Sequence, residues 1–424
     1  MKTLKTTAIA AALLSASIPA NAATIATNAD GWEISFGGTI NLFYNTYESE
    51  AYNDIDGITS SAKEIHLQEG LLPAFATFKA KSPTINGLTG TAQISFAPDS
   101  SNSKLRRQDK GGSAIDMREV FFDVGGSFGT FSIGRTLGIF QRQAILKDQT
   151  LFGVGAGAAG DGSGTTLGRI GYGYVCPAFD TRFSYKTPDM NGLQLEVGLY
   201  DPYETASDLG GALPETELPR LETELTYGTN FGAGSVNAWG GLLWQEMDFG
   251  AAGDVKSFGW NLGAQLIFGG FEFVGSYYDG EALGVDLKTD GSAGKGTSAI
   301  GGAAGFTCAG FTGCEEADND GFYAQLGYTF ATKTKVAVGY GESNQDGKAG
   351  VFNDVSHELW TVGVYHDVNS WLKIVAEYND SENNADNTSG SVDPTRLDGA
   401  FNPLLLGNEG SEAQVFSVGA FIFW

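Results

Sequence analysis

The chain has 424 residues and a formal net charge of −25, and 61 of its residues are glycine. This glycine content, about 14%, is roughly twice the usual share. It disfavours a long helical protein, because each glycine in a helix costs about 1 kcal/mol relative to alanine. Collagen is excluded by the lack of a Gly-X-Y period, and 42% hydrophobic residues argue against simple disorder. The excess of acids makes nucleic acid a poor partner. A large β protein rich in glycine and aromatic residues remains.

The first 22 residues have the features of a secretory signal. Lys2 and Lys5 give a positive start, residues 8–14 are an apolar stretch, and residues 20–22 form a small-x-small cleavage site. We therefore expect cleavage after residue 22 and a single domain over residues 23–424. No later run approaches the ~18–20 apolar residues that a membrane helix needs. An exported soluble protein and a transmembrane β-barrel are the two classes left.

Strict alternation of apolar and polar residues predicts strands along the whole mature chain. In residues 33–45 the even positions include Ile40 and Leu42, and the odd positions between them include Thr39 and Asn41. Residues 255–268 and 321–330 follow the same pattern. In a soluble sandwich the apolar face would pack on a second sheet, whereas in a barrel it would face lipid. Glycines on the polar face favour the barrel, since they leave room for water.

Two kinds of connection separate the predicted strands. Short ones carry turn residues, and we expect them near residues 86–87, 125–126, 191–192, 232–234, 269–270, 332–334 and 368–370. Long acidic ones are expected at about 48–72, 98–115, 138–167, 201–218, 248–254, 280–319, 344–356 and 380–412. The two kinds alternate, which predicts an all-β fold: a 16-stranded antiparallel transmembrane β-barrel with short periplasmic turns and long external loops. Such a barrel is wide enough for an aqueous channel.

The end of the chain introduces a resemblance to a known family. Phe416, Ile422 and Trp424 lie on one face of an alternating segment that ends in an aromatic residue. This ending resembles the general diffusion porins of Gram-negative outer membranes, 16-stranded trimers whose last strand is presented to the barrel-assembly machinery. Residues 117–135 are also similar to the fourth and fifth porin strands, with a Gly-Ser-Phe-Gly turn and a final Gly134-Arg135.

The resemblance implies a constriction in the pore rather than a catalytic centre. The segment of about 136–167 resembles the third loop of porins, which folds into the barrel, and it returns through Gly168-Arg169. By position, the resemblance implies wall cations at Arg118, Arg169 and Lys79, opposed by loop acids at Asp148 and Asp161, with Arg135 nearer the subunit interface. Strict alternation would send Glu119 outward if Arg118 points inward. A bulge or a trimer-interface position would resolve this conflict.

Further lumen-facing charges follow from the alternation. These are the acids Glu196, Glu222, Glu224, Glu272 and Glu377 and the bases Arg182, Lys186, Lys335 and Lys373. Acids dominate the long loops, so we expect a mild preference for cations. The same acids could instead bind divalent cations that bridge lipopolysaccharide. No other cofactor is expected.

The cysteines and histidines give two further expectations. Cys308 and Cys314 lie in one external loop and could form a disulfide, whereas Cys176 is expected on a lipid-facing strand, with a bulge near residues 177–180. The three histidines have no metal-ligand spacing, and no Gly-x-Ser-x-Gly motif occurs, so an enzyme is not expected.

The sequence therefore predicts a homotrimeric outer-membrane porin for passive diffusion of small hydrophilic solutes, surrounded by lipid and lipopolysaccharide. A substrate-specific channel and a structural or adhesive barrel are the alternatives.

Overall fold

The structure is a computed structural model. It describes residues 23–27, 30–53, 57–98, 115–156, 165–202, 215–284, 305–309, 313–351, 353–387, 392–397, 403–405 and 408–424. Its helices are short: α1 (Arg142–Lys147) and the 3₁₀ turn η3 (Gly250–Ala252). Within these ranges no helix has the length and apolar character needed to cross a membrane.

The described residues form a closed antiparallel β-barrel with sixteen wall strands, as predicted. The strands follow one another around the wall: β2 (Glu33–Asn53), β3 (Gly57–Gln68) continued by β4 (Phe75–Lys81), β5 (Thr89–Pro98), β6 (Ile115–Gly126), β7 (Gly129–Leu137), β8 (Phe179–Lys186), β9 (Leu193–Tyr200), β10 (Arg220–Phe231), β11 (Gly234–Asp248), β12 (Asp254–Phe268), β13 (Phe271–Glu281), β16 (Asp318–Thr329), β17 (Thr334–Gln345), β18 (Asp354–Asp367), β19 (Leu372–Asp386) and β22 (Glu409–Phe423). Pairing of β2 with β22 closes the barrel. Closure leaves no open edge among these strands, which is what a sheet in lipid requires.

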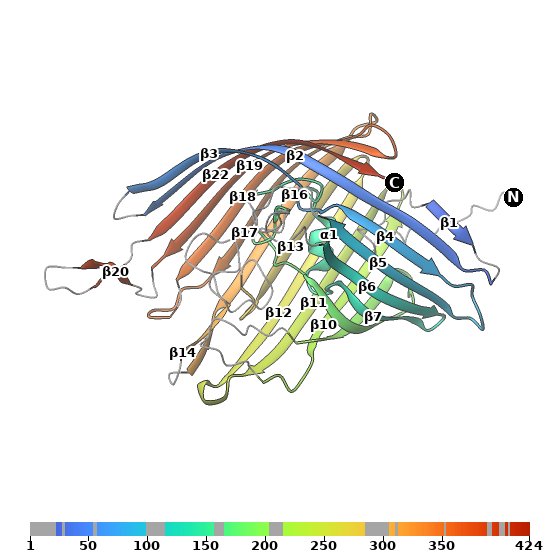
Figure 1. Cartoon of the computed structure of the whole chain (residues 1–424), viewed down its shortest axis with the longest axis horizontal. Helices are drawn as coiled ribbons and strands as arrows, with labels where there is room; N and C mark the ends of the chain where they lie inside the picture. The colour runs from blue at the N-terminus through green and yellow to red at the C-terminus, as the bar shows by residue number, and fades with distance from the viewer. Residues whose placement is uncertain are drawn as a thin grey trace.

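The strands β3 and β4 form one wall position because both pair with β2, β3 with its outer part and β4 with its first residues. The short strand β1 (Ala23–Thr27) pairs with the same start of β2, beyond the end of β22. Outside the wall lie two small hairpins, β14 (Phe306–Ala309) with β15 (Gly313–Glu316), and β20 (Val392–Leu397) with β21 (Pro403–Leu405). Figure 1 shows β1 and the C-terminal end of the chain on the same side of the barrel.

The two faces of the wall follow the predicted alternation. On β2, Ile40 is 51% exposed while its neighbour Asn41 is 1% exposed. Exposed apolar side chains recur on the outer face of the other strands, as at Leu262 and Leu326, and the inner face carries buried polar ones such as Asn261. An apolar outside and a polar inside are the arrangement that a barrel in lipid needs.

All seven short turns lie within two residues of the predicted positions; the largest shift is after β6, where the turn is at 127–128 instead of 125–126. At one of these turns Asn86 and Gly87 have φ of 52° and 80°, the left-handed pair that a two-residue hairpin requires. The other end of the barrel differs from the prediction at residues 48–72. There β2 and β3 continue as a long hairpin, so that His66 lies on a strand. Among the described residues of this segment, only 69–74 leave the wall.

The segment after residue 167 also differs from the prediction. Residues 168–178 form no wall strand, and β8 begins only at Phe179. Tyr174 is fully buried inside the barrel, and Cys176 packs against the same interior cluster. The prediction that Cys176 faces lipid is therefore wrong. Tyr172 and Tyr174 alternate as they would on a strand, but their side chains contact groups inside the barrel and do not face lipid. Tyr174 bonds to Asp148, and the ring of Tyr172 lies 5.6 Å from that of His357. A bulge near residues 177–180 is therefore not needed.

Candidate functional site

Between β7 and β8, the described residues of the segment 138–178 run inside the barrel and include α1 (Figure 1). We call it the inner loop, and its described part covers 138–156 and 165–178. It is longer than the predicted 136–167, because its return crosses the interior before β8 starts. Its apolar side chains, including Ile145 and Ile170, pack in one cluster with Trp239 of β11 and Tyr323 of β16, and with Leu71 from the segment between β3 and β4. The inner loop therefore bridges the lumen.

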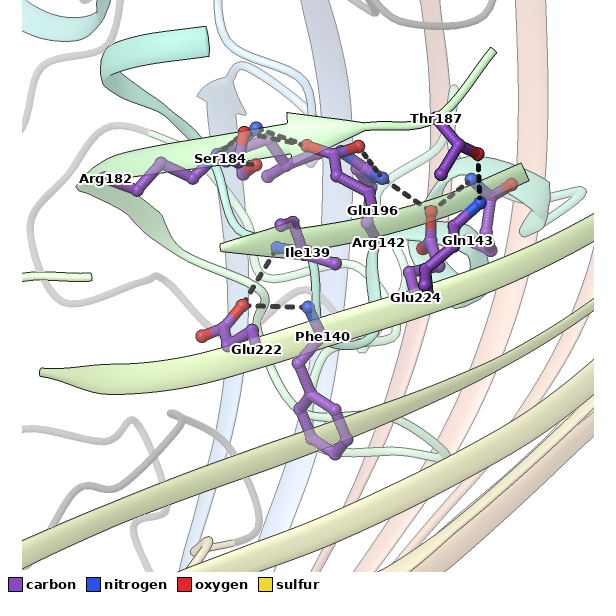
Figure 2. A network of polar contacts seen from close by, with 12 residues as sticks. Ile139, Phe140, Arg142, Gln143, Arg182, Ser184, Thr187, Glu196, Glu222 and Glu224 are labelled. Carbon is purple, nitrogen blue, oxygen red and sulfur yellow. Dashed lines mark hydrogen bonds and ion pairs between the residues drawn. The ribbon is translucent and has the colours of Figure 1, made fainter. Parts of the chain in front are cut away.

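Buried carboxylates of β9 and β10 hold one end of the inner loop (Figure 2). The guanidinium of Arg142 in α1 donates to Glu196 at 2.8 Å and to Glu224 at 2.5 Å. A single carboxylate oxygen of Glu222 accepts the backbone N–H groups of Ile139 and Phe140, both at 2.9 Å. All three acids were predicted to face the lumen. Their partners now show that they bind the loop rather than stand free in the channel.

Side-chain burial makes these contacts strong determinants of the loop position. The side chains of Arg142, Glu196 and Glu224 are only 3%, 6% and 5% exposed. A carboxylate removed from water needs hydrogen-bond donors or a cation, because its desolvation costs several kcal/mol. Glu196 also contacts Arg182 at 3.5 Å. Detaching α1 would strand these charges, so the structure favours one loop position.

Glu377 of β19 holds the far side of the inner loop. It accepts the backbone N–H of Val154 at 2.7 Å and that of Gly155 at 3.3 Å. Next to them Gly153 has no side chain, and a Cβ added there would lie 1.7 Å from the Glu377 carboxylate. Glycine is required here because the backbone itself lies against the acid. The loop is thus attached to opposite parts of the wall.

Asp148, predicted as the acid that faces the pore, is a third anchor. It is 5% exposed and accepts from Gln325 Nε2 at 2.6 Å, from the Tyr174 hydroxyl at 3.0 Å and from Thr150. Arg169 is fully buried and donates from the loop to β18, to the Leu359 carbonyl at 3.1 Å and to Thr361 Oγ1 at 2.8 Å. The structure therefore places Arg169 on the loop rather than on the wall.

Arg118 and Glu119 both reach the interior because β6 carries a bulge. The β5–β6 register shifts between Ser95 and Ala97, opposite Glu119 and Asp116. The bulge was one of two explanations that the sequence left open. The Arg118 guanidinium pairs with Asp116 at 2.7 Å and lies 5.6 Å from the centre of the Phe179 ring. Glu119 is buried and accepts from Gln93 and Ser95, each at 2.8 Å.

The remaining predicted site residues are dispersed. Lys79 pairs in register with Gln93 on the lumen face of β4 and is half-buried. Arg135 is exposed on the outward face of β7, in register with Val120. Asp161 lies outside the described residues. Of the predicted set, only Arg118 and Arg135 contribute to the larger cavity described next.

Two cavities flank the inner loop. The outer cavity, about 470 Å³, lies between the loop and strands β4–β8 and includes Arg118, Arg142 and Arg182 in its lining. The inner cavity, about 260 Å³, lies towards the turns of β16–β19 and includes Lys147, Lys335 and Lys373. Leu146 and Leu151 line both cavities and separate them. Burial lowers the pKa of the Lys147 ammonium, against the opposite effect of the nearby Glu272 and Glu224 carboxylates.

The other predicted features lie away from the loop. Cys308 and Cys314 are register partners in the β14–β15 hairpin, and the Cys308 side chain is outside the described residues. At the chain end, Trp424 exchanges two backbone hydrogen bonds with Gly38, and its ring lies 6.3 Å from that of Phe36. Phe416 and Ile422 are exposed on the outer face. Among the described residues, no group of three or more His, Cys, Asp or Glu side chains could hold a metal ion.

Comparison with known proteins decides the family. The sequence profile described as "Gram-negative porin" matches residues 6–386. The chain belongs to the Gram-negative porins. This membership assigns the barrel to the outer membrane and its activity to diffusion through a channel rather than to catalysis. No curated protein matches the chain in sequence.

Solved structures share the porin fold at low sequence identity. An anion-selective porin from Comamonas acidovorans is 14% identical with a TM-score of 0.56, over 93% of this chain and 100% of that one. The outer-membrane channel DcaP of Acinetobacter baumannii is 14% identical with a TM-score of 0.60, over 92% and 99%. OmpF of Salmonella typhi, in complex with daunomycin, is 14% identical with a TM-score of 0.53, over 93% and 98%.

Several residues of the site could not be found by sequence reasoning. Arg142, the residue that joins α1 to two wall carboxylates, follows Gln141 in a loop with no alternation and no motif. The only signal was indirect: three acids predicted to face the lumen on neighbouring strands need cationic or N–H partners once they are buried. The loop backbone supplies some of these partners, which no side-chain pattern can indicate.

Proposed function

We propose that this porin is a water-filled channel for passive diffusion of ions and small hydrophilic solutes, with a mild preference for cations. The observation that carries the proposal is the inner loop, which is fixed across a lumen with polar walls. A loop held at several points narrows the lumen without any moving part, as passive sieving by size requires.

The charges suggest that ion preference arises at the outer mouth rather than at the constriction. Inside, acids and bases pair or bond to the loop backbone, as at Glu272 with Lys335, 2.7 Å apart, and Asp367 with Lys373, 2.6 Å apart. At the outer strand ends, acids outnumber bases. Described examples are Glu48, Glu50, Glu64, Asp248, Asp254, Glu281, Asp318, Asp346, Asp354, Glu382, Asp386, Glu409 and Glu412. An acidic mouth raises the local concentration of cations.

Purified porin in planar bilayers tests both parts of the proposal. We expect stable open channels in KCl, and a reversal potential in a KCl gradient that favours K⁺. The preference should shrink as ionic strength rises, because the Debye length falls from about 10 Å at 0.1 M to about 3 Å at 1 M. A reversal potential that favours Cl⁻ at low salt would refute the cation preference. Near-zero conductance would instead support the structural or adhesive alternative.

A substrate-specific channel is the second candidate, favoured by the mixed apolar and charged lining of the outer cavity. It would show saturable block of the current by one class of solute. A channel for simple diffusion would show no saturable block.

The proposed assembly follows the resemblance to porins. We propose cleavage of the signal after residue 22, insertion through the barrel-assembly machinery with the strand that ends in Trp424, and a homotrimer in lipid and lipopolysaccharide. The acidic outer rim would be the place for bridging divalent cations. The opposition of Cys308 and Cys314 in their hairpin supports the proposed disulfide.

A further inference from the structure

The outer cavity has an apolar lining that is not fully packed. This cavity of about 470 Å³ includes Leu72, Leu137, Leu146, Leu167, Ile170 and Phe179. Five of these side chains are only partly buried, so they face the open space rather than a packed core. Apolar surface exposed to water in a channel is costly, and it indicates a place where an apolar group can bind.

Polar groups at the same cavity lack hydrogen-bond acceptors among the described residues. Thr166 is 1% exposed and Arg142 is 3% exposed, and both line the cavity. Within the described part of the chain, the Thr166 hydroxyl and Arg142 Nε have no hydrogen-bond partner. A buried donor that is left unsatisfied costs about 1–3 kcal/mol. Two such donors at one cavity leave room for further acceptors, which water or a bound solute can supply.

The charge of the cavity selects an anionic acceptor. Arg118 is 20% exposed, and it lies over the Phe179 ring while bonding to Asp116 through Nε. The geometry leaves its terminal nitrogens as further donors beside an aromatic surface. Arg135, Arg142 and Arg182 also line the cavity, with Asp116 and Glu119 as the acids of the lining. Arg142 and Arg182 are paired with Glu196, so Arg118 is the cation that would meet a bound anion. Carboxylates suit such arginine donors because two oxygens can accept in parallel.

We propose that the outer cavity binds small amphipathic carboxylates, with an aromatic or branched apolar body against the leucines and the carboxylate near Arg118 and Thr166. The proposal rests on the channel function above and names its substrate class. A cavity of about 470 Å³ is within the size range of small-molecule sites. Leu146 and Leu151 separate this cavity from the inner cavity, and the outer cavity lies on the side of the external loops. It would therefore bind such solutes before they pass the inner loop.

The test uses the full mature porin and benzoate as the probe. We expect benzoate added to the outer side to reduce the ion current in a saturable way, and isothermal titration of the detergent-solubilised porin to give the same affinity. Acetate tests the carboxylate alone, and benzyl alcohol tests the apolar body alone. Each should bind at least about tenfold more weakly than benzoate, which is a difference of about 1.4 kcal/mol.

Three variants locate the site. Thr166→Val removes the hydroxyl at constant shape, and Arg118→Gln removes one cation, so each should weaken benzoate binding about tenfold. Lys335→Gln removes a cation of the inner cavity and should leave benzoate binding unchanged. Leu72→Trp would fill the outer cavity and should abolish benzoate binding while the KCl conductance persists.

Three outcomes would overturn the proposal: binding of acetate equal to that of benzoate, binding of benzyl alcohol equal to that of benzoate, or benzoate affinity unaffected by Thr166→Val and Arg118→Gln. Titration in detergent needs no open channel. A barrel that conducts no ions but binds benzoate would therefore refute the diffusion function and support the binding site. A barrel that conducts ions but does not bind benzoate would support the diffusion function and refute the binding site.

Discussion

Arg142 offers the sharpest test of how the inner loop is held. Replacement by methionine keeps an unbranched stem but removes the guanidinium that contacts Glu196 at 2.8 Å and Glu224 at 2.5 Å. Both carboxylates would stay buried. Removal of one partner from a buried ion pair costs about 3–5 kcal/mol, because the stranded charge keeps its desolvation penalty. Since about 1.4 kcal/mol is a factor of ten, the detached state of α1 should become at least a hundredfold more populated.

Single-channel recording and liposome swelling measure this effect. We expect Arg142→Met to give a noisier current and to admit larger sugars, because the end of the loop near β9 and β10 would leave its place. The thermal unfolding of the barrel should change little, since the pairing of the wall strands does not involve Arg142. Unchanged noise together with an unchanged size limit would show that the ion pairs do not position the loop.

A matched control separates burial from ion pairing as such. Lys63 and Glu48 form an ion pair of the same length, 2.8 Å, on the outer hairpin, but their side chains are 78% and 59% exposed. Exposed pairs contribute about 0–1 kcal/mol, so Lys63→Met should leave the current and the size limit unchanged. Combining Arg142→Met with Glu196→Gln and Glu224→Gln removes the stranded charges and should restore part of the quiet current.

Three further predictions use other parts of the barrel. Gly153→Ala places a Cβ 1.7 Å from the Glu377 carboxylate and should alter single-channel conductance, whereas Gly275→Ala, whose nearest neighbour would lie at 3.6 Å, should not. Asp318→Asn with Asp346→Asn removes two rim acids and should lower the K⁺ preference measured at 0.1 M KCl, and an unchanged reversal potential would contradict a mouth-controlled preference. If Cys308 and Cys314 are bonded, the unfolded, unreduced protein should titrate with one thiol, that of Cys176, and with three after reduction.

The barrel itself could be predicted from the sequence because its signals are local. The alternation of neighbouring residues predicts that Ile40 faces outward and Asn41 inward, as the structure has them. The residue types of Asn86 and Gly87 alone predict the turn that they form. The bulge beside Arg118 could be named only as one alternative, since whether β6 gains a residue depends on its register with β5. Alternation even misled at residues 168–178, where Tyr172 and Tyr174 have strand spacing but lie against the interior.

The contacts of the inner loop could not be predicted because they join distant parts of the chain. Glu222 is 82 residues from Phe140, and Glu377 is 223 residues from Val154. In both contacts the donor is a backbone N–H, a group that every residue but proline carries. The sequence can show that an acid faces the lumen, but the choice of its partner depends on where the loop backbone passes.

These contacts also change what the net charge of −25 means for the channel. Glu196, Glu222, Glu224 and Glu377 are all at most 5% exposed and are bound by a guanidinium or by N–H groups, so their charges serve to hold the loop. Acids that remain in water lie mainly at the outer strand ends. A passing ion therefore meets an acidic mouth first, and then a passage in which the charges are already paired. On this argument, salt in the medium should control the ion preference, whereas mutations at the loop anchors should control the size limit.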